Sequence, residues 1–400
     1  MTKITDIPAI RFKGFSDTWE QRKLSEIATM HARIGWQNLR TSEFLDSGDY
    51  MLITGTDFID GAVNFDTCHY VERERYEQDK HIQIRNGSIL ITKDGTLGKV
   101  AYIQGLTMPA TLNAGVFNVE IKDENEVDNR YLFQYLKAPF LMDYVDKKAT
   151  GGTIKHLNQN ILVDFPVVLP HKAEQEKIGE YFLAIDHLIT LHQRKYDKLT
   201  NVKKSMLEKM FPQNGSNVPE IRFKGFTEAW EQRKVREVTD RYDNLRIPVA
   251  ASLRVAGTTP YYGANGIQDY VDGYTHDGEF ILVAEDGAND LKNYPVKCVK
   301  GRIWVNNHAH VLQGKYDCAD NQFLAYAISQ ADIESLLVGG GRAKLNAETL
   351  MGIDLLLPNK AEQIRIGKYL AQLDNLITLH QRELEKLKNL KKACLEKMFV

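Results

Sequence analysis

The sequence lacks long hydrophobic runs. Its first residues, MTKITDIPAIRF, contain no apolar stretch like the centre of a secretory signal. A run of about 18 apolar residues, which would suggest a membrane-spanning helix, is also absent. We therefore expect a cytoplasmic protein without a membrane partner. With 400 residues, 43% of them hydrophobic, the chain is long enough for two or three domains with their own cores.

Cysteine is scarce. The four cysteines are Cys68, Cys298, Cys318 and Cys394, and no two of them form a Cys-x-x-Cys pair. This pattern indicates free thiols in a reducing compartment and argues against a structural disulfide. Cys298 and Cys318 flank His308 and His310, but their spacing matches no zinc framework. We therefore expect no metal site, and core or surface positions for these four side chains.

The chain also lacks an excess of positive charge. Its 51 Lys and Arg residues face 53 Asp and Glu residues, giving a formal net charge of −2. A protein that binds nucleic acid unaided is usually basic. Any DNA-binding role must therefore explain how the phosphate charge is neutralised.

The common catalytic signatures are missing. No Gly-x-x-x-x-Gly-Lys-Ser/Thr loop occurs, and GTLGKV at 95–100 is too short for one and is more typical of a hairpin turn. The Asn/Asp-Pro-Pro-aromatic signature of amino-methyltransferases is absent, as are Gly-x-Ser-x-Gly and His-Glu-x-x-His. We therefore predict no catalytic residues and no cofactor bound by this chain.

The sequence does contain a long internal repeat. IRFKGFSDTWEQRK at 10–23 returns as IRFKGFTEAWEQRK at 221–234, with three of the fourteen positions changed. A second block, Leu169–Phe211, returns as Leu357–Phe399 with 27 of 43 positions identical. We call these two repeated blocks the frame. The segments that they enclose, 24–168 and 235–356, share only fragments of pattern, so the frame is duplicated and its contents are not.

The enclosed segments predict two α+β domains. GSILITKDGTLGKVAYI (87–103) parallels GEFILVAEDGANDLKNYPV (278–296), and TLNAGVFNVE (111–120) parallels WVNNHAHVLQ (304–313). Short apolar runs broken by Asp-Gly turns are typical of hairpins in a twisted sheet. One helix is expected in each copy, over 130–145 and over 321–337. Each copy then reaches a glycine turn followed by Leu-Asn, at 151–158 and 339–346, where Gly151, Gly152, Gly339 and Gly340 are expected to supply positive φ angles.

The second repeated block predicts a long heptad helix in each copy. Apolar residues recur at alternating spacings of three and four, which is typical of a coiled coil, and we call these positions the seam. In the first copy the seam contains Ile178, Phe182, Ile185, Ile189, His192, Tyr196, Leu199, Lys203, Met206 and Met210. In the second it contains Ile366, Leu370, Leu373, Ile377, His380, Leu384, Leu387, Lys391, Cys394 and Met398. Two such helices can bury their seams against each other and, at roughly 40 residues each, form a spacer on the order of 60 Å long.

The ends of these helices and the seam histidines carry further signals. Pro170 and Pro358 precede the helices, and the Glu-Gln pairs at 174–175 and 362–363 fall in the first turns, where acidic groups suit a helix N-terminus. His192 and His380 occupy matching seam positions. A metal-binding or catalytic role is one interpretation, but a polar seam residue more commonly fixes the register of the helix pair.

The domain boundaries follow from the repeat. We predict an N-terminal segment with the first α+β domain at 1–168, a helix at 169–211 and a linker at 212–220. The second domain then spans 221–356 and the second helix 357–400.

The repeated IRFKGF…WEQRK, the variable domain, the Leu-Asn turn, LP…KAEQ and the heptad helix together resemble the frame of type I restriction-modification specificity subunits. The similarity covers essentially the whole chain. It implies two target recognition domains, about 20–168 and 231–356, separated by an antiparallel pair of coiled-coil helices. It also implies two methyltransferase subunits docked on the helices, which use S-adenosylmethionine, and restriction subunits that use ATP and Mg.

This resemblance accounts for the low charge and predicts the form of the DNA target. If partner subunits neutralise phosphates, the recognition subunit can remain near neutral and contact base edges. Two different domains related by a pseudo-twofold and held apart by a spacer should read two different half-sites of double-stranded DNA about a helical turn apart. The bases between them would go unread.

We predict DNA-contacting residues in the polar loops of both domains, because Arg, Lys, Asn and Gln suit base edges and phosphates. Single positions could equally be solvated turns or half-buried aromatics. In the first domain the candidates are Arg33, Trp36, Gln37, Arg40, Lys93, Thr96, Lys99, Lys155 and His156. In the second they are Tyr261, Tyr262, Asn265, Asn289, Asn307, His308, Arg342 and Lys344.

Two other functional classes remain open. A duplicated protein-binding adaptor could use the same frame, although it would have no need for unlike domains at symmetric positions. An enzyme that acts on DNA unaided is the other alternative, and the missing catalytic signatures argue against it.

Overall fold

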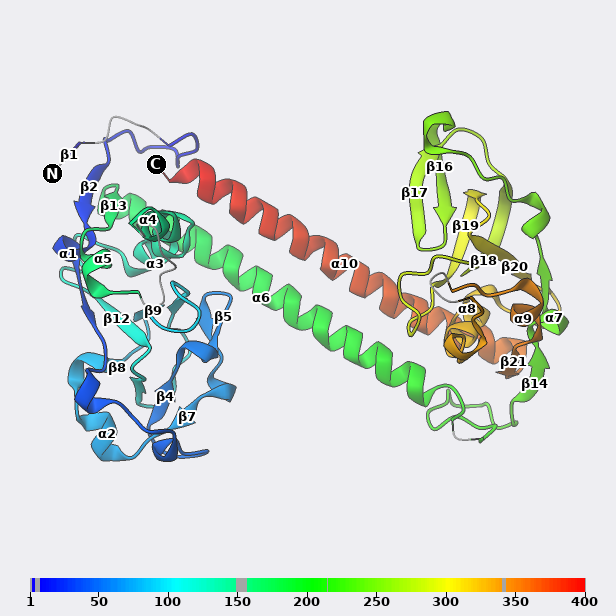
Figure 1. The fold of residues 1–400 in the computed structure, drawn as a ribbon, viewed down its shortest axis with the longest axis horizontal. Coiled ribbons are helices and arrows are strands. Elements are labelled where there is room, and N and C mark those ends of the chain that lie inside the picture. Colours follow the sequence, from blue (N-terminus) through cyan, green and yellow to red (C-terminus); the bar gives the residue numbers. More distant parts are fainter. Residues whose placement is uncertain (1, 4–7, 149–156, 214, 340–342, 400) are drawn as a thin grey trace. The chain divides into compact units, whose positions relative to one another are not determined.

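The computed structural model describes residues 2–3, 8–148, 157–213, 215–339 and 343–399. The chain divides into two compact units, Met1–Leu191 with Glu383–Val400 (unit 1) and His192–Arg382 (unit 2). Figure 1 shows the elements of both units. All four cysteines are free thiols. In the described part of the chain, no helix has both the length and the apolar character that crossing a bilayer requires.

Unit 1 contains a four-stranded antiparallel sheet with the order β10-β9-β12-β3. Its strands are β3 (Ala28–His31), β9 (Ile89–Thr92), β10 (Val100–Tyr102) and β12 (Val116–Ile121). Side chains alternate between the two faces of β9: Ile89 and Ile91 belong to one hydrophobic cluster and Leu90 to another. Both faces of this strand are therefore buried, which explains its uninterrupted apolar sequence.

A second, mixed sheet of unit 1 has the order β7-β4-β11-β8, in which β4 and β11 are parallel. Its strands are β4 (Met51–Ile53), β7 (His69–Tyr70), β8 (Gln83–Ile84) and β11 (Ala110–Leu112). The remaining short elements are the hairpin β5 (Phe58–Ile59) and β6 (Ala62–Val63), with the helices α1 (Leu24–Ile27), α2 (Arg73–Glu77) and α5 (Gln159–Val163).

Unit 2 contains one six-stranded mixed sheet with the order β15-β20-β18-β19-β16-β17. Its strands are β15 (Thr239–Arg241), β16 (Ala256–Gly263), β17 (Gly266–Val271), β18 (His276–Ala284), β19 (Val296–Val305) and β20 (Ala309–Gly314). Ile281 and Val283 face one hydrophobic cluster, whereas Phe280 and Leu282 face another. Central strand β18 is therefore buried on both faces, as β9 is in unit 1.

The two units share one core topology. The order β10-β9-β12-β3 in unit 1 corresponds to β19-β18-β20-β15 in unit 2. The register also agrees, since Leu90 pairs with Asn118 and Leu282 pairs with Val311. Outside this common sheet a parallel pairing also recurs, since Leu52 on β4 pairs with Thr111 and Tyr261 on β16 pairs with Trp304. Unit 1 places this pairing in its second sheet, whereas unit 2 extends its main sheet with it. The α+β prediction for both domains is confirmed.

The predicted domain helices are shorter than expected. In unit 1, α3 (Asn129–Lys137) ends before Ala138, and α4 (Phe140–Lys148) begins after Pro139, so one continuous helix over 130–145 was wrong. Proline disfavours a helical conformation for the residue before it, and Ala138 is extended with ψ 162°. In unit 2, α8 (Asn321–Ser329) ends early, and a short 3-10 helix covers Glu334–Leu336. Asp128 and Asp320 cap α3 and α8 at equivalent positions.

The Leu-Asn motifs start short helices in both units. Leu157 and Leu345 are buried, and α5 and α9 (Ala347–Gly352) begin directly after Asn158 and Asn346. Gly339 has φ +93°, as expected. The glycines at 151, 152 and 340 lie outside the described residues.

The first repeated block forms a short strand and a buried anchor. In unit 1, β2 (Glu20–Lys23) lies between β1 (Thr2–Lys3) and β13 (Pro166–Leu169) and pairs with both. In unit 2, β14 (Glu231–Lys234) pairs with β21 (Asp354–Leu357). The short helix α7 (Val235–Val238) follows β14. Trp19 and Trp230 lie in the cores of their units. The WEQRK motif thus places its tryptophan inside and uses the next four residues as a strand.

The second repeated block forms the two long helices α6 (Lys172–Lys209) and α10 (Lys360–Met398), which pack together. In unit 1, Asp186 contacts Lys391 and Tyr181 contacts Cys394; in unit 2, His192 contacts His380 and Lys203 contacts Asp374. Along α6 the residue numbers of these contacts increase while those of their partners on α10 decrease. The two helix segments therefore run antiparallel within each unit. All twenty predicted seam residues are buried or partly buried, which agrees with the heptad pattern.

The KAEQ motif joins each long helix to its own domain. Glu174 is buried and accepts two 2.7 Å bonds from Arg11, and Glu362 does the same from Arg222. The neighbouring Gln175 bonds the backbone at Glu126, Asp128 and Pro170. Gln363 repeats this with Cys318, Asp320 and Pro358. The motif therefore fixes each domain to a helix start.

The ends of the long helices enter the cores of the units. Phe211, just after α6, stacks on Phe323 in unit 2, and Phe399, just after α10, packs on Phe182 in unit 1. The N–H of Ile10 donates to Lys397 O, as the N–H of Ile221 donates to Lys209 O. Both copies of the first block therefore hold the end of a long helix in the same way.

Candidate nucleic-acid interface

Three loops meet at the end of the central strand in each unit, and we call this arrangement the three-loop junction. In unit 1, the N–H of Lys93 donates to Gly115 O at 2.9 Å, and the N–H of Leu157 donates to Lys93 O at 2.8 Å. In unit 2, the N–H of Glu285 donates to His308 O at 2.9 Å, and the N–H of Leu345 donates to Glu285 O at 2.7 Å. The backbone is therefore the same while the side chains differ.

The junction of unit 1 presents the predicted β9–β10 hairpin turn. Lys93 is half-buried with its ammonium 5.4 Å from the Phe117 ring centre, whereas Thr96 and Lys99 are exposed. Thr92 Oγ1 donates to Thr96 O and accepts from the N–H of Lys99 at 2.9 Å, which stiffens the turn. Gly95 and Gly98 supply φ angles of +74° and +69°. Lys155 and His156, also predicted contacts, lie outside the described residues.

The loop 33–40 contains both buried and exposed side chains. Arg33 is buried, and its guanidinium donates to Leu112 O at 3.0 Å, to Gln78 Oε1 at 3.1 Å and to Thr111 Oγ1. Burial, and then the nearby charge of Arg75, lowers its pKa from the usual value. Gln37 is also buried, and its Oε1 accepts from the N–H of Ile34.

The Arg33 and Gln37 side chains therefore support the loop in this structure and do not face solvent, which differs from their expected role as base contacts. Trp36, with 73% of its surface exposed, and Arg40 remain available. The buried contacts of Arg33 lie far away in the sequence, so the loop sequence alone gave no sign of them.

The junction of unit 2 gathers several predicted contacts. Asn265 Nδ2 donates to Gly287 O, and its Oδ1 accepts from the N–H of Asn289, both at 2.9 Å. His308 Nδ1 lies 2.5 Å from Asp286 Oδ1, and Lys344 Nζ lies 2.9 Å from Glu285 Oε1.

These residues come from the three loops of the junction and from the β16–β17 turn, which Asn265 joins to one of them. The Asn265, Asn289 and Asn307 side chains are exposed there, while His308 and Lys344 are half-buried. Arg342 lies outside the described residues.

Tyr261 and Tyr262 are buried, contrary to a role as exposed contacts. The hydroxyl of Tyr261 accepts from the N–H of Val249 at 2.9 Å, and the Arg254 guanidinium lies 4.1 Å from its ring centre. Tyr261 therefore anchors the preceding segment, 249–254. Alternation along β16 does not distinguish a core tyrosine from a surface one.

A buried polar network lies beneath the unit 2 junction and was missed by sequence reasoning. His310 faces acceptors on both ring nitrogens: Nδ1 lies 2.7 Å from Asp243 Oδ2, and Nε2 lies 2.9 Å from Leu345 O. Arg246 donates to Glu285 Oε2 at 2.6 Å. Burial alone would raise the pKa of Asp243, but the bonds from His310 and the Val311 N–H outweigh it and the pKa is lowered. The network fixes Glu285, the central residue of the junction.

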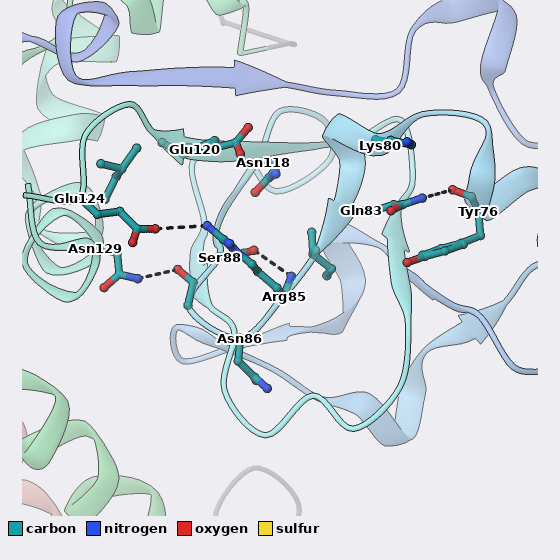
Figure 2. Close-up of a pocket in the computed structure, with 14 residues that line it drawn as sticks. Tyr76, Lys80, Gln83, Arg85, Asn86, Ser88, Asn118, Glu120, Glu124 and Asn129 are labelled. Atoms are coloured by element: carbon teal, nitrogen blue, oxygen red, sulfur yellow. Dashed lines mark hydrogen bonds and ion pairs between the residues drawn. The ribbon is translucent and has the colours of Figure 1, made fainter.

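Unit 1 also has a polar hollow of about 640 Å³ (Figure 2). It is lined by Arg85, Asn118 and Asn129, among others, and none of the predicted DNA contacts lines it. Arg85 pairs with Glu124 at 3.2 Å, and Asn129 Nδ2 donates to Gly87 O at 3.1 Å. The polar groups here largely bond one another.

The family model for the type I restriction modification DNA specificity domain matches residues 16–201 and 227–389. A putative type I specificity subunit of Haemophilus influenzae is 44% identical over 146 residues, which cover 36% of this chain and 38% of that protein. A putative MjaX specificity subunit of Methanocaldococcus jannaschii is 24% identical over 98% of this chain and 93% of its own length.

A solved structure shares the fold. The S subunit of a type I restriction-modification system from M. genitalium superposes with a TM-score of 0.74, covering 98% of this chain and 99% of that one, at 15% identity. Because the family model covers both copies of the repeat, the chain belongs to the type I restriction-modification specificity subunits, which are non-catalytic.

Proposed function

We propose that each unit reads one half of an asymmetric, bipartite DNA site through its three-loop junction. The observation that carries this proposal is the pairing of one backbone arrangement with two different sets of side chains. Unit 1 offers Lys93, Thr96 and Lys99, whereas unit 2 offers asparagines, His308 and a Lys344–Glu285 pair. Lysine suits guanine or phosphate, and asparagine can pair bidentately with adenine. The two junctions should therefore prefer different bases.

The low net charge supports binding as part of a complex. A chain of net charge −2 neutralises few phosphates by itself. The recognition subunit would then bind DNA weakly and with strong salt dependence when alone, and tightly when partner subunits hold the duplex. Equally tight sequence-specific binding by the isolated chain would contradict this proposal.

Two methyltransferase subunits are the partners that we propose for the long helices. Leu188 and Leu191 on α6 are exposed, and so are Leu376 and Leu379, which occupy the same repeat positions on α10. Exposed leucines close together on a helix can mark a docking surface, and their duplication suits two copies of one partner. The partners would supply S-adenosylmethionine and adenine methylation, and restriction subunits would supply ATP- and Mg-dependent cleavage. This assignment fits the cytoplasm, where free thiols persist.

A domain exchange tests the reading of half-sites. Residues 24–168 are replaced by the recognition domain of another specificity subunit, and methylated adenines are mapped in cells that express the hybrid with its methyltransferase. We expect only one half of the methylated sequence to change. A change in both halves, or in neither, would contradict the proposal. A protein-binding adaptor, the alternative function, would give no methylation pattern and no DNA footprint in the reconstituted complex.

Glutamate substitutions test the docking surface. Leu188→Glu with Leu376→Glu should abolish co-purification of the methyltransferase without lowering the melting temperature, since both leucines are exposed. Thr200→Glu, at an exposed position of α6, is the matched control and should still co-purify the partner. Full retention of the methyltransferase by the leucine variant would rule out this surface.

A further inference from the structure

Three potential metal ligands converge in unit 1 from three separate elements. His31 ends β3, His81 lies in the short 3-10 helix Lys80–Ile82, and Glu120 lies on β12. Their ligand atoms all lie within 4.8 Å of one another. His31 Nε2 is 3.8 Å from Glu120 Oε2, and the two imidazole rings stack with centres 4.5 Å apart.

The backbone holds these three residues in place. Strands β12 and β3 pair with Asn118 opposite His31 and Glu120 opposite Thr29. Asn118 Nδ2 donates to His81 O at 3.0 Å, and Asp79 Oδ1 accepts from the N–H of His81 at 2.9 Å. The 3-10 helix is therefore fastened to the strand that carries Glu120.

We propose that His31, His81 and Glu120 bind a zinc ion. Two imidazoles and one carboxylate form a ligand set that zinc favours, with bonds of about 2.0–2.2 Å, and the fourth position is left to water. Tetrahedral geometry then places ligand atoms about 3.4 Å apart, so the present separations must close by roughly 1 Å. His31 and His81 are partly or fully exposed and can rotate.

The surrounding charges permit a cation at this position. Lys122, directly after β12, donates from Nζ to Ser25 O at 2.5 Å, so its ammonium is directed to the backbone. His31 Nε2 lies 3.0 Å from Thr29 Oγ1, a contact that the imidazole would give up on binding the ion. Glu120 would supply the negative charge that a site with two neutral imidazoles needs.

The site belongs to the variable part of the chain and not to the frame. In unit 2, Tyr242 occupies the position of His31. Its N–H donates to the carbonyl of Val311 on β20, the strand that corresponds to β12. Gln313, two residues after Val311 on β20, occupies the position of Glu120. Its Nε2 donates to Glu279 O. Unit 2 therefore lacks two of the three ligands and provides an internal comparison.

Zinc binding would stiffen the start of a recognition loop. His31 lies two residues before Arg33, whose buried guanidinium holds the loop that carries Trp36 and Arg40. The ion would tie this strand end to the 3-10 helix and to β12. This consequence rests on the proposed reading of DNA by unit 1, whereas zinc binding itself does not.

Cobalt and zinc titrations of the full chain test the site. Wild-type protein should bind one Co²⁺ with the visible absorption of a four-coordinate ion, and one equivalent of Zn²⁺ should displace it. Because loss of a supporting partner alone weakens metal affinity by about 10–100-fold, His81→Asn and Glu120→Gln should each weaken it by at least roughly 100-fold. His187→Asn, at an exposed position of α6, is the control and should bind as the wild type does.

Thermal unfolding separates a lost ligand from a lost fold. Without metal, His81→Asn should melt as the wild type does; with zinc, only the wild type and His187→Asn should melt at a higher temperature. Equal affinity of wild type and His81→Asn, or no cobalt band in the wild type, would overturn the proposal. Neither result would alter the methylation map of the domain exchange, so the two proposals fail separately.

Discussion

The Nδ1 atoms of His192 and His380 lie 3.0 Å apart, so the same residue of each repeat meets its counterpart between α6 and α10. One ring must donate and the other accept, which leaves no place for a second proton between them. This pairing suits a register marker, because shifting either helix by one residue would separate the rings.

The histidine pair predicts a loss of stability in mild acid. Burial, followed by the nearby charges of His192 and Lys195, lowers the pKa of His380. A histidine whose folded pKa lies below its unfolded value stabilises the fold above pH ~6.5, and this contribution is lost as the pH falls further. The midpoint of urea unfolding should therefore decrease from pH 7.5 to pH 5.

The double variant His192→Asn with His380→Asn provides the control for this effect. It should show a smaller decrease over the same range. It should not remove the decrease completely, because burial also lowers the pKa of His276 in the same unit. An unchanged pH dependence in the double variant would show that the pair does not contribute.

The buried pair Arg222–Glu362 predicts a large effect of a single substitution. Glu362 is fully buried, and Arg222 supplies two 2.7 Å bonds to it. Arg222→Met would leave the carboxylate without its partner, which costs about 3–5 kcal/mol of unfolding free energy. Adding Glu362→Met should recover most of that loss, as measured by urea unfolding.

The exposed pair Arg85–Glu124 is the comparison for this experiment. Arg85→Met should change the unfolding free energy by less than about 1 kcal/mol, because exposed ion pairs contribute little. Equal effects at both sites would mean that burial does not determine the strength of the Arg222–Glu362 contact.

The frame could be predicted from the sequence because its two blocks are each repeated. The spacing of the seam residues identified both long helices, and the closely similar blocks predicted similar local structures. The roles of Glu174 and Glu362 could not be predicted in the same way. An acidic residue in a first helical turn suggests a helix terminus, but its arginine partner is far away in the sequence.

The candidate site was only partly predictable, because a loop sequence does not say which side chains turn inward. Lys99, Thr96 and Asn265 lie on exposed turns, as a polar pattern would suggest. Arg33 and Tyr261 are buried by partners on distant strands. The junction itself consists of backbone bonds between segments that are remote in sequence, so it became visible only in the fold.

Gly179 and Gly367 predict a steric requirement at the start of each long helix. A Cβ at Gly179 would lie 2.8 Å from Tyr131 N, and one at Gly367 would lie 2.9 Å from Phe323 N. Alanine would push α3 or α8 away from the long helix, which we expect to cost about 1–3 kcal/mol. Gly35→Ala, where a Cβ meets no atom within 4 Å, should leave the melting temperature nearly unchanged.

Arg33 and Trp36, three residues apart, should fail in different ways when they are substituted. Arg33→Met removes the bonds to Leu112 O, Gln78 and Thr111, so it should lower the stability of unit 1 by about 2–3 kcal/mol. Trp36→Ala removes a mostly exposed ring and should leave the melting temperature unchanged. If Trp36 contacts bases or phosphates, the reconstituted complex should nevertheless bind its DNA at least tenfold more weakly.

Measuring melting temperature and DNA affinity for both variants separates support of the loop from contact with DNA. Arg33→Met should change both quantities, because a loosened loop also misplaces Trp36. Trp36→Phe should retain more affinity than Trp36→Ala, since an aromatic face remains. If Trp36→Ala binds DNA as the wild type does, Trp36 does not contribute to DNA binding. Unit 1 would then contact DNA through the hairpin that carries Lys93 and Lys99.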